Sequence, residues 1–173
     1  MRGYVMCIGL LALLSCCAFA QTDTPRFEVF GGYSYLHSHT GSAVAGANAN
    51  GWNASAMWNW NRHWGIKADV DGHYCCDGER LHNFLAGPQY TIRMDNWNVF
   101  FHGLGGMSHG SVPGFSESTG AWAAGAGIDV DLFKSQRVAV RLIQGDYIGT
   151  MYGGTTQHHF RYSGGFVLRL GKK

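Results

Sequence analysis

Apolar and polar side chains alternate along most of this chain with a period of two, which is the pattern of a β-strand with one apolar face. The clearest example covers residues 159–171. Its apolar face consists of large or aromatic residues: Phe160, Tyr162, Phe166, Leu168 and Leu170. The opposite face carries arginines and includes Val167 between two apolar positions. At roughly ten to twelve residues the strand is about twice the usual globular length, which predicts one face toward lipid and one toward a lumen.

The same alternation predicts seven further strands, at residues 26–37, 52–60, 64–74, 82–93, 97–107, 122–131 and from 138 onward. Short turns at 61–63, 94–96 and 133–136 alternate with longer loops at 38–50, 75–80, 108–118 and 149–157. This rhythm is typical of bacterial outer-membrane barrels. The pattern therefore predicts an all-β fold, an eight-stranded antiparallel up-and-down transmembrane β-barrel with both termini on the periplasmic side.

Two positions depart from the alternation. Pro88 falls within a predicted strand, where proline costs a ladder hydrogen bond unless it lies at a bulge. Beyond Leu142 the strict alternation would place Gln144 and Asp146 on the outer face. We therefore expect either a bulge at Gly145 or emergence of the strand from the membrane there.

Charged residues fall mainly on the predicted inner faces, in balanced numbers. The acids are Glu28, Asp69, Asp71, Asp129 and Asp131, and the bases are Lys67, Arg93, Arg141, Arg161 and Arg169. Eight strands enclose an interior that side chains just fill, and buried charges need partners or water. We expect an internal salt-bridge network and no open channel.

The N-terminal residues have the form of a secretory signal peptide. Arg2 precedes an apolar run that ends in Ala18-Phe19-Ala20, a small-x-small cleavage site. Residues 1–20 are thus expected to be removed after Ala20, which leaves residues 21–173 as the barrel domain. An alternative is a lipoprotein cleavage box that would leave Cys16 lipidated.

Composition narrows the class of protein further. Charged residues make up 14% and aromatic residues 14% of the 173 residues, and 26 are glycine, which suits tightly turning strands with rings at membrane interfaces. Trp52 and Trp60 stand at the two ends of one predicted strand, as aromatic girdles do. The net charge of +2 argues against a nucleic-acid partner. Outside the leader there is no apolar run of about 18 residues, so a spanning helix is excluded.

These segments resemble the small eight-stranded outer-membrane barrels of the OmpA/OmpX type over nearly all of residues 26–171. The matching pieces are the leader end, the paired glycines of FGGYSY, the hairpin strands GAGIDVDL and RVAVRL, and the closing strand. The resemblance implies an outer-membrane location, contact with membrane lipid and lipopolysaccharide, and delivery by the barrel-assembly machinery. Such chains usually end on an aromatic residue, whereas this sequence ends Leu170-Gly171-Lys172-Lys173. Recognition would then rest on Phe166, Leu168 and Leu170.

Some barrels of this size modify lipid A, and hydrolase chemistry of that kind needs an activated serine. A serine nucleophile needs a base within hydrogen-bond reach. His159 and Ser163 share a face but lie about 13 Å apart along a strand, which is too far. His109 and Ser111 would share a face with Glu117 nearby, but the segment is predicted to be a loop. We therefore do not expect an enzyme.

Histidine and cysteine are the remaining candidate ligands. His37, His39, His158 and His159 end or begin strands that barrel closure makes neighbours, and grouped imidazoles take Zn or Cu. Polar rim residues in water are the favoured interpretation, so we expect no metal and no cofactor. Cys75 and Cys76 are adjacent and cannot close an ordinary disulfide loop. A vicinal disulfide, two thiols and a soft-metal site all remain open.

We expect a non-enzymatic outer-membrane barrel with a structural or surface-interaction role through its outer loops, whose extracellular ligand the sequence does not name. The first alternative is a lipid A-modifying enzyme. The second is a soluble exported barrel that binds a small ligand. That second fold would need its aromatic face inside and the charges of Lys67 and Arg141 outside.

Overall fold

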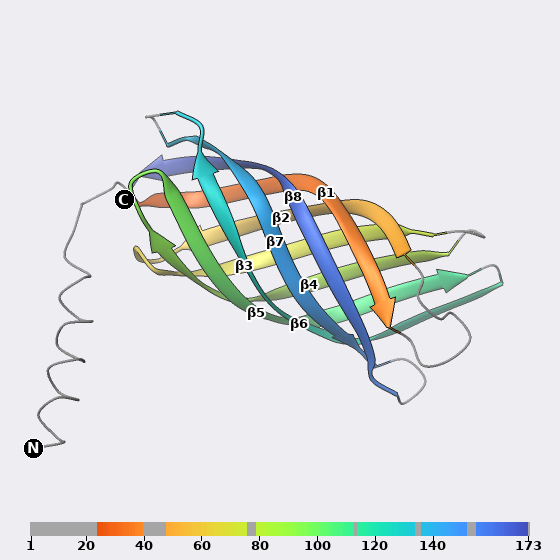
Figure 1. Ribbon diagram of the computed structural model, residues 1–173. Coiled ribbons are helices and arrows are strands. Elements are labelled where there is room, and N and C mark those ends of the chain that lie inside the picture. Colours follow the sequence, from red (N-terminus) through yellow and green to blue (C-terminus); the bar gives the residue numbers. More distant parts are fainter. Residues whose placement is uncertain are drawn as a thin grey trace, which may run out of the picture.

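The computed structural model describes residues 24–39, 48–75, 79–112, 114–133, 136–151 and 155–172. These residues form a closed barrel of eight antiparallel strands, each paired with its neighbours in chain order (Figure 1). The strands are β1 (Pro25–His39), β2 (Asn48–Asn59), β3 (Trp64–Tyr74), β4 (Arg80–Arg93), β5 (Trp97–Val112), β6 (Phe115–Asp131), β7 (Val138–Thr150) and β8 (Gln157–Lys172). The predicted fold class is confirmed. None of the described residues belongs to a helix long and apolar enough to cross a membrane.

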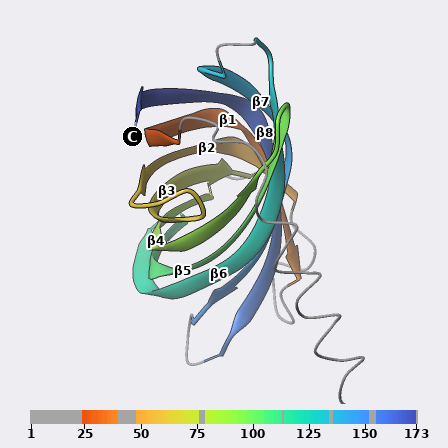
Figure 2. The same ribbon diagram turned by 90° about the vertical axis from the view of Figure 1, so that its left-hand side faces the viewer.

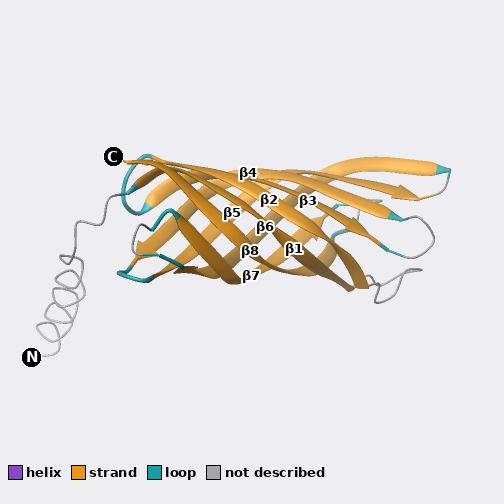
Figure 3. Cartoon of the chain, turned by 90° about the horizontal axis from the view of Figure 1, so that it is seen from above, coloured by secondary structure: helices purple, strands orange, loops and turns teal. Residues whose placement is uncertain are grey.

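The barrel closes between its first and last strands. β1 pairs with β8 from Pro25 opposite Lys172 to His39 opposite His158, so the two ends of the described chain lie side by side (Figure 1). Two glycines allow the backbones to approach at this seam: a Cβ on Gly32 would stand 2.1 Å from the carbonyl oxygen of Gly164. Viewed after a 90° turn, the strands wrap around a common interior (Figure 2). In Figure 3 the strands of the near wall run at an angle to those of the far wall, as expected when all strands tilt relative to the barrel axis.

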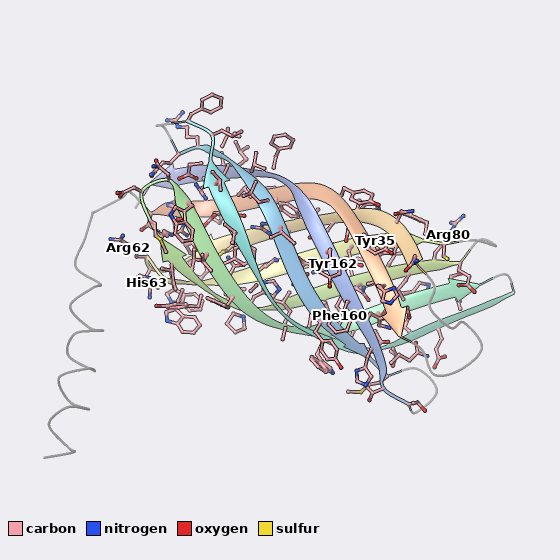
Figure 4. All side chains as sticks on the ribbon, in the orientation of Figure 1. Tyr35, Arg62, His63, Arg80, Phe160 and Tyr162 are labelled. Carbon is pink, nitrogen blue, oxygen red and sulfur yellow. The ribbon has the colours of Figure 1, made fainter. Side chains whose placement is uncertain are left out.

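The two ends of the barrel differ. The turn end carries the connections after β2, β4 and β6 together with the two chain ends, and the loop end carries the other connections. In the turn after β2, the Asn61 side-chain oxygen accepts hydrogen bonds from the backbone N–H groups of His63 at 2.8 Å and Trp64 at 2.7 Å. Figure 4 shows Arg62 and His63 at this end and Arg80 at the loop end.

One predicted loop is instead a hairpin. β5 continues to Val112 and β6 begins at Phe115, with Ser108 opposite Thr119 and His109 opposite Ser118. The segment 108–118 is rich in glycine and serine, which predicted a loop, but cross-strand pairing keeps it extended. The hairpin reaches the right-hand edge of the barrel in Figure 1, in green and teal.

The predicted irregularity in β7 is a bulge, but it lies earlier than expected. The register with both β6 and β8 shifts by one residue here, and Leu142 and Ile143 both face outward, 62% and 50% exposed. Two successive apolar side chains can both face lipid, and the shift turns Gln144 and Asp146 inward. The expectation of a bulge at Gly145, or of emergence there, is therefore wrong in position.

Pro88 is accommodated without a bulge. It lies opposite Ile66 of β3 in unshifted register. On its other side the ladder with β5 is interrupted between Ala86 and Gln89, and the register is the same before and after the gap. Proline lacks a backbone N–H donor, and the sheet tolerates this as one local interruption of the hydrogen bonds between β4 and β5.

The barrel has its apolar side chains outside and its charges inside. Lys67 and Arg141 are 1% and 5% exposed, whereas large apolar residues on β1 to β5, β7 and β8 are exposed on the outer face. Trp58, Trp60, Trp64 and Trp97 lie exposed near the turn end, and Trp52 lies exposed toward the loop end. This polarity overturns the soluble ligand-binding alternative, which required the opposite arrangement.

Some sequence expectations fall on residues outside the described ranges. These are the leader 1–20 with its cleavage site, the possible lipidation of Cys16, and Cys76. Cys75 is described, and its Sγ donates a hydrogen bond to the Asn48 carbonyl oxygen at 3.6 Å.

Candidate functional site in the barrel interior

The interior near the turn end holds a cluster around Glu28. Its carboxylate accepts hydrogen bonds from Arg93 Nη2 at 2.6 Å, Asn59 Nδ2 at 2.8 Å and Arg169 Nε at 3.3 Å. Arg169 pairs in addition with Asp131. Because β1, β2, β4, β6 and β8 all contribute, this cluster ties together strands that are distant in sequence.

At mid-height one arginine is held between two aromatic rings. Arg141 donates two hydrogen bonds to the carboxylate of Asp129, at 2.8 and 3.1 Å, and a third to Gln144 at 2.7 Å. The centre of its guanidinium lies 4.3 Å from the ring centroid of Phe30 and 4.2 Å from that of Phe100. Charge pairing and cation–π contact therefore act on the same side chain.

The next cluster toward the loop end is built around Arg161, which is fully buried. Its guanidinium pairs with Asp146 at 2.6 Å, with Asp69 at 2.7 Å, and with Asp71. Lys67 Nζ lies 3.1 Å from the second oxygen of Asp69. The positive charge of one guanidinium thus neutralises carboxylates from β3 and β7, and the ammonium group of Lys67 also pairs with Asp69.

Asp146 is an interior charge that sequence reasoning missed. It pairs with Arg161 and also contacts His102 Nε2 at 2.8 Å and Gln144 Nε2 at 2.7 Å. Strict alternation placed it outside because the bulge residues had not been recognised. The signal present in the sequence is the apolar pair Leu142-Ile143 followed by polar residues at alternate positions.

Apolar side chains fill part of the interior toward the loop end. Toward the loop end, the inward-facing residues that follow Ser34 on β1 and Asp146 on β7 are Leu36 and Ile148. They belong to one buried cluster: Leu36, Ala49, Leu85, Leu104, Ala121, Ala123 and Ile148. The alternation of side chains predicted the charges of the lumen but not this apolar cluster.

All ten residues predicted to line the lumen lie inside the barrel, and each takes part in at least one ion pair. With Asp146 the interior holds six carboxylates against five lysine and arginine side chains. His102 contacts Asp146, and His73 Nδ1 lies 3.1 Å from Asp71. Since the charges nearly balance and each has a partner, burial of the set is compatible with a stable fold.

The three candidate metal-binding histidines whose side chains are described, His37, His158 and His159, do not share one site. His39 is opposite His158 in register, as expected for neighbouring strands, but His158 is exposed and His159 is buried. His159 bonds Thr150 inside at 3.1 Å, and His37 bonds Asn48 at 2.7 Å. Among the described residues no group of three or more His, Cys, Asp or Glu side chains could hold a metal ion.

The candidate hydrolase residues are also separated. His109 Nδ1 hydrogen-bonds Ser118 at 2.8 Å rather than Ser111. Glu117 is opposite Gly110, the neighbour of His109, so its side chain faces the other side of the hairpin. The arrangement contains a serine and a histidine in contact, with Glu117 unable to orient the histidine.

Comparison with known proteins places the fold. No family model and no curated protein matches the sequence. Neisserial surface protein A matches the structure with a TM-score of 0.69 at 12% identity, over 83% of this chain and 97% of that one. Ail, the attachment invasion locus protein of Yersinia pestis, matches with a TM-score of 0.56 at 18% identity, over 84% and 99%.

A third match is the N-terminal β-barrel domain of Pseudomonas aeruginosa OprF, with a TM-score of 0.54 at 8% identity, over 85% of this chain and 100% of that one. Ail has also been solved in complex with the heparin analogue sucrose octasulfate. All three neighbours are eight-stranded outer-membrane β-barrels. At these identities the likeness shows that the chain shares their fold.

Proposed function

We propose that this chain is a non-enzymatic outer-membrane barrel that serves envelope structure or surface contact through its loop end. The turn end and both termini face the periplasm, and the loop end faces outward. Short turns on one side and longer connections on the other support this orientation, because outer-membrane barrels are built that way. The barrel-assembly machinery would deliver the chain, and outer-leaflet lipid, including lipopolysaccharide, would surround it.

The observation that carries this proposal is the reversed polarity of the barrel. Phe166, Leu142 and Met107 are among the most exposed side chains, while the buried set is dominated by ion pairs. Soluble monomers rarely expose continuous apolar surface of this extent. A lipid bilayer covers such a surface, and closed barrels satisfy every strand edge within it.

Folding in lipid tests the proposal directly. The mature protein, unfolded in urea, is diluted into buffer with increasing lipid-to-protein ratio, and folding is followed by the change in gel mobility on boiling. We expect folding only when lipid or detergent is present, and recovery of the cellular protein in outer-membrane fractions. Cooperative folding in plain buffer, or a soluble periplasmic protein, would end the membrane assignment.

We also propose that the barrel is closed to ions. The ion pairs of Arg161 and the buried apolar cluster that includes Leu36 and Ile148 both occupy the interior. Purified protein in planar bilayers should show no steady single-channel conductance. Removal of Arg161 together with its carboxylate partners would be needed to create a continuous polar path.

The absence of lipid chemistry is tested in cells. The geometry around His109 and Ser118 lacks an orienting carboxylate among the described residues, which supports a non-enzymatic role. Lipid A from cells that overproduce the protein should match lipid A from control cells in acyl content. A changed acyl profile that disappears in Ser118→Ala would restore the enzyme alternative.

A further inference from the structure

Four residues in register across β2 to β5 form a row on the outer face near the loop end. Row one consists of Trp52, Gly72, His82 and His109. Glycine at its second place lets two rings lie over the backbone, since a Cβ on Gly72 would stand 2.9 Å from both the His82 imidazole and Trp52 Nε1. Tyr74 completes the group: it accepts a hydrogen bond from Trp52 Nε1 at 3.3 Å, and its ring meets that of His82 edge to face at 5.7 Å.

A second row of the same composition crosses β6, β7, β8 and β1. Row two consists of Trp122, Gly149 and His158, and the backbone of His39 is opposite His158 in register. The Trp122 ring lies over Gly149, 2.5 Å from the place of a Cβ. Tyr147 again joins the group, because its ring stacks on His158 at 5.5 Å and its hydroxyl hydrogen-bonds His158 Nδ1 at 2.6 Å.

Two members of row one have counterparts at a common spacing of 70 residues: Trp52 corresponds to Trp122, and His109 to His39. Val29, Phe30, Ser38, His39 and Trp52 recur at the same spacing as Val99, Phe100, Ser108, His109 and Trp122. Corresponding residues lie four strands apart, which in a closed eight-stranded barrel means opposite walls. Together the rows use every strand once.

An exposed phenyl ring lies next to each row, on the side toward the turn end. Phe84 follows His82 by two residues toward the turn end, Phe160 follows His158 in the same way, and both phenyl rings are exposed. The histidine nitrogens and tyrosine hydroxyls of each row therefore lie next to an apolar ring, on its loop-end side. Neither row contains an acidic residue, and Arg80 flanks row one on its loop side.

From this arrangement we infer that each row binds the phosphate of one phosphorylated glycolipid of the outer leaflet. The imidazoles of His82 and His158 donate N–H groups to phosphate oxygens, and acyl chains run along Phe84 or Phe160. The protein thus has two equivalent lipid sites on opposite walls. This inference rests on the proposed outer-membrane location.

Counting bound lipids tests the inference. Folded protein in non-ionic detergent, with a chelator present to exclude bridging cations, is titrated with diphosphoryl lipid A and analysed by native mass spectrometry. We expect two retained lipids for the wild type, one for His82→Phe or His158→Phe, and none for the double variant. His63→Phe is the matched control, because His63 stacks on Tyr90 at the turn end, outside both rows, and should leave two.

Two further arms identify the ligand. Lipid A without phosphates should not be retained, and excess inorganic phosphate should not displace the diphosphoryl lipid. Equal retention of the dephosphorylated lipid, displacement by phosphate alone, or two lipids on every variant would each overturn the inference. Gel mobility before boiling confirms that every variant is folded. Failure of wild type to need detergent for folding would instead refute the membrane assignment itself.

Discussion

Asp146 and Arg161 are opposite each other on β7 and β8, and their side chains form an ion pair at 2.6 Å inside the barrel. The pair exists because the bulge at Leu142 and Ile143 turns Asp146 inward. Arg161 also reaches Asp69 on β3, so one guanidinium joins two separate parts of the wall. The bulge and the interior charge cluster are therefore one structural feature.

Replacing Arg161 by methionine should destabilise the barrel strongly. The change leaves Asp69, Asp71 and Asp146 buried without their shared partner, and breaking a buried ion pair costs about 3–5 kcal/mol. Urea titration of the protein folded in vesicles measures the loss. Arg80→Met, at an exposed position, is the control and should change stability little. Equal losses for the two variants would contradict the assigned role of Arg161.

Deleting Leu142 should be tolerated. The deletion removes the extra bulge residue, so Arg141 stays inside, Ile143 stays outside and the register with β6 and β8 becomes continuous. Deleting Val140 in the same strand should fail, because it forces either Arg141 or its neighbours onto the lipid face, at a cost of about 2–4 kcal/mol. Folding yield in lipid, read from gel mobility, compares the two. Similar yields would show that the bulge does not set the facing of β7.

Two adjacent glycines on β1 should respond differently to alanine. A Cβ on Gly32 would meet the Gly164 carbonyl oxygen at 2.1 Å, whereas a Cβ on Gly31 meets nothing within 4 Å. Gly32→Ala should thus loosen the closing seam and lower the urea midpoint, and Gly31→Ala should leave it unchanged or raise it slightly, because alanine restricts the unfolded chain. A reversed order of the two midpoints would refute the close approach of β1 and β8.

Phe166→Arg should cost about 2–4 kcal/mol, as charges do near the middle of a bilayer. Phe166 is 64% exposed on the outer face, so Phe166→Leu is the control and should be close to neutral.

The neighbouring Val167 is 1% exposed and packs with Phe30 and Ala139. Val167→Arg should be no milder, because overpacking costs about 1–3 kcal/mol and the charge has no prepared partner. Equilibrium unfolding in vesicles made from lipids of increasing bilayer thickness distinguishes the two variants. The loss of unfolding free energy should grow with bilayer thickness for Phe166→Arg and stay constant for Val167→Arg.

The strands were predictable because alternation follows from backbone geometry. A residue such as Phe166 must face away from Val167 wherever the chain is extended, so facing could be read directly from the sequence. Composition was a weaker guide. The glycine- and serine-rich segment around His109 predicted a loop, whereas pairing of His109 with Ser118 extends the hairpin.

The interior site was predictable residue by residue but not pair by pair. Parity placed Lys67 and Arg161 inside, yet the contact of Arg161 with Asp71 depends on how β8 and β3 face each other across the lumen. The strand sequences do not encode that distance. Asp146 was missed for a local reason, because one extra residue in β7 reverses the parity of everything after it.

The cluster around Glu28 joins the first strand of the barrel to the last. Glu28 stands on the first strand and Arg169 on the last, and Arg169 also compensates Asp131. A polypeptide that stops before Arg169 leaves these acids without that cation. Loss of Arg169 and the residues after it would therefore also remove the β1–β8 pairing at Phe27 and Pro25, and the seam would be open at the turn end.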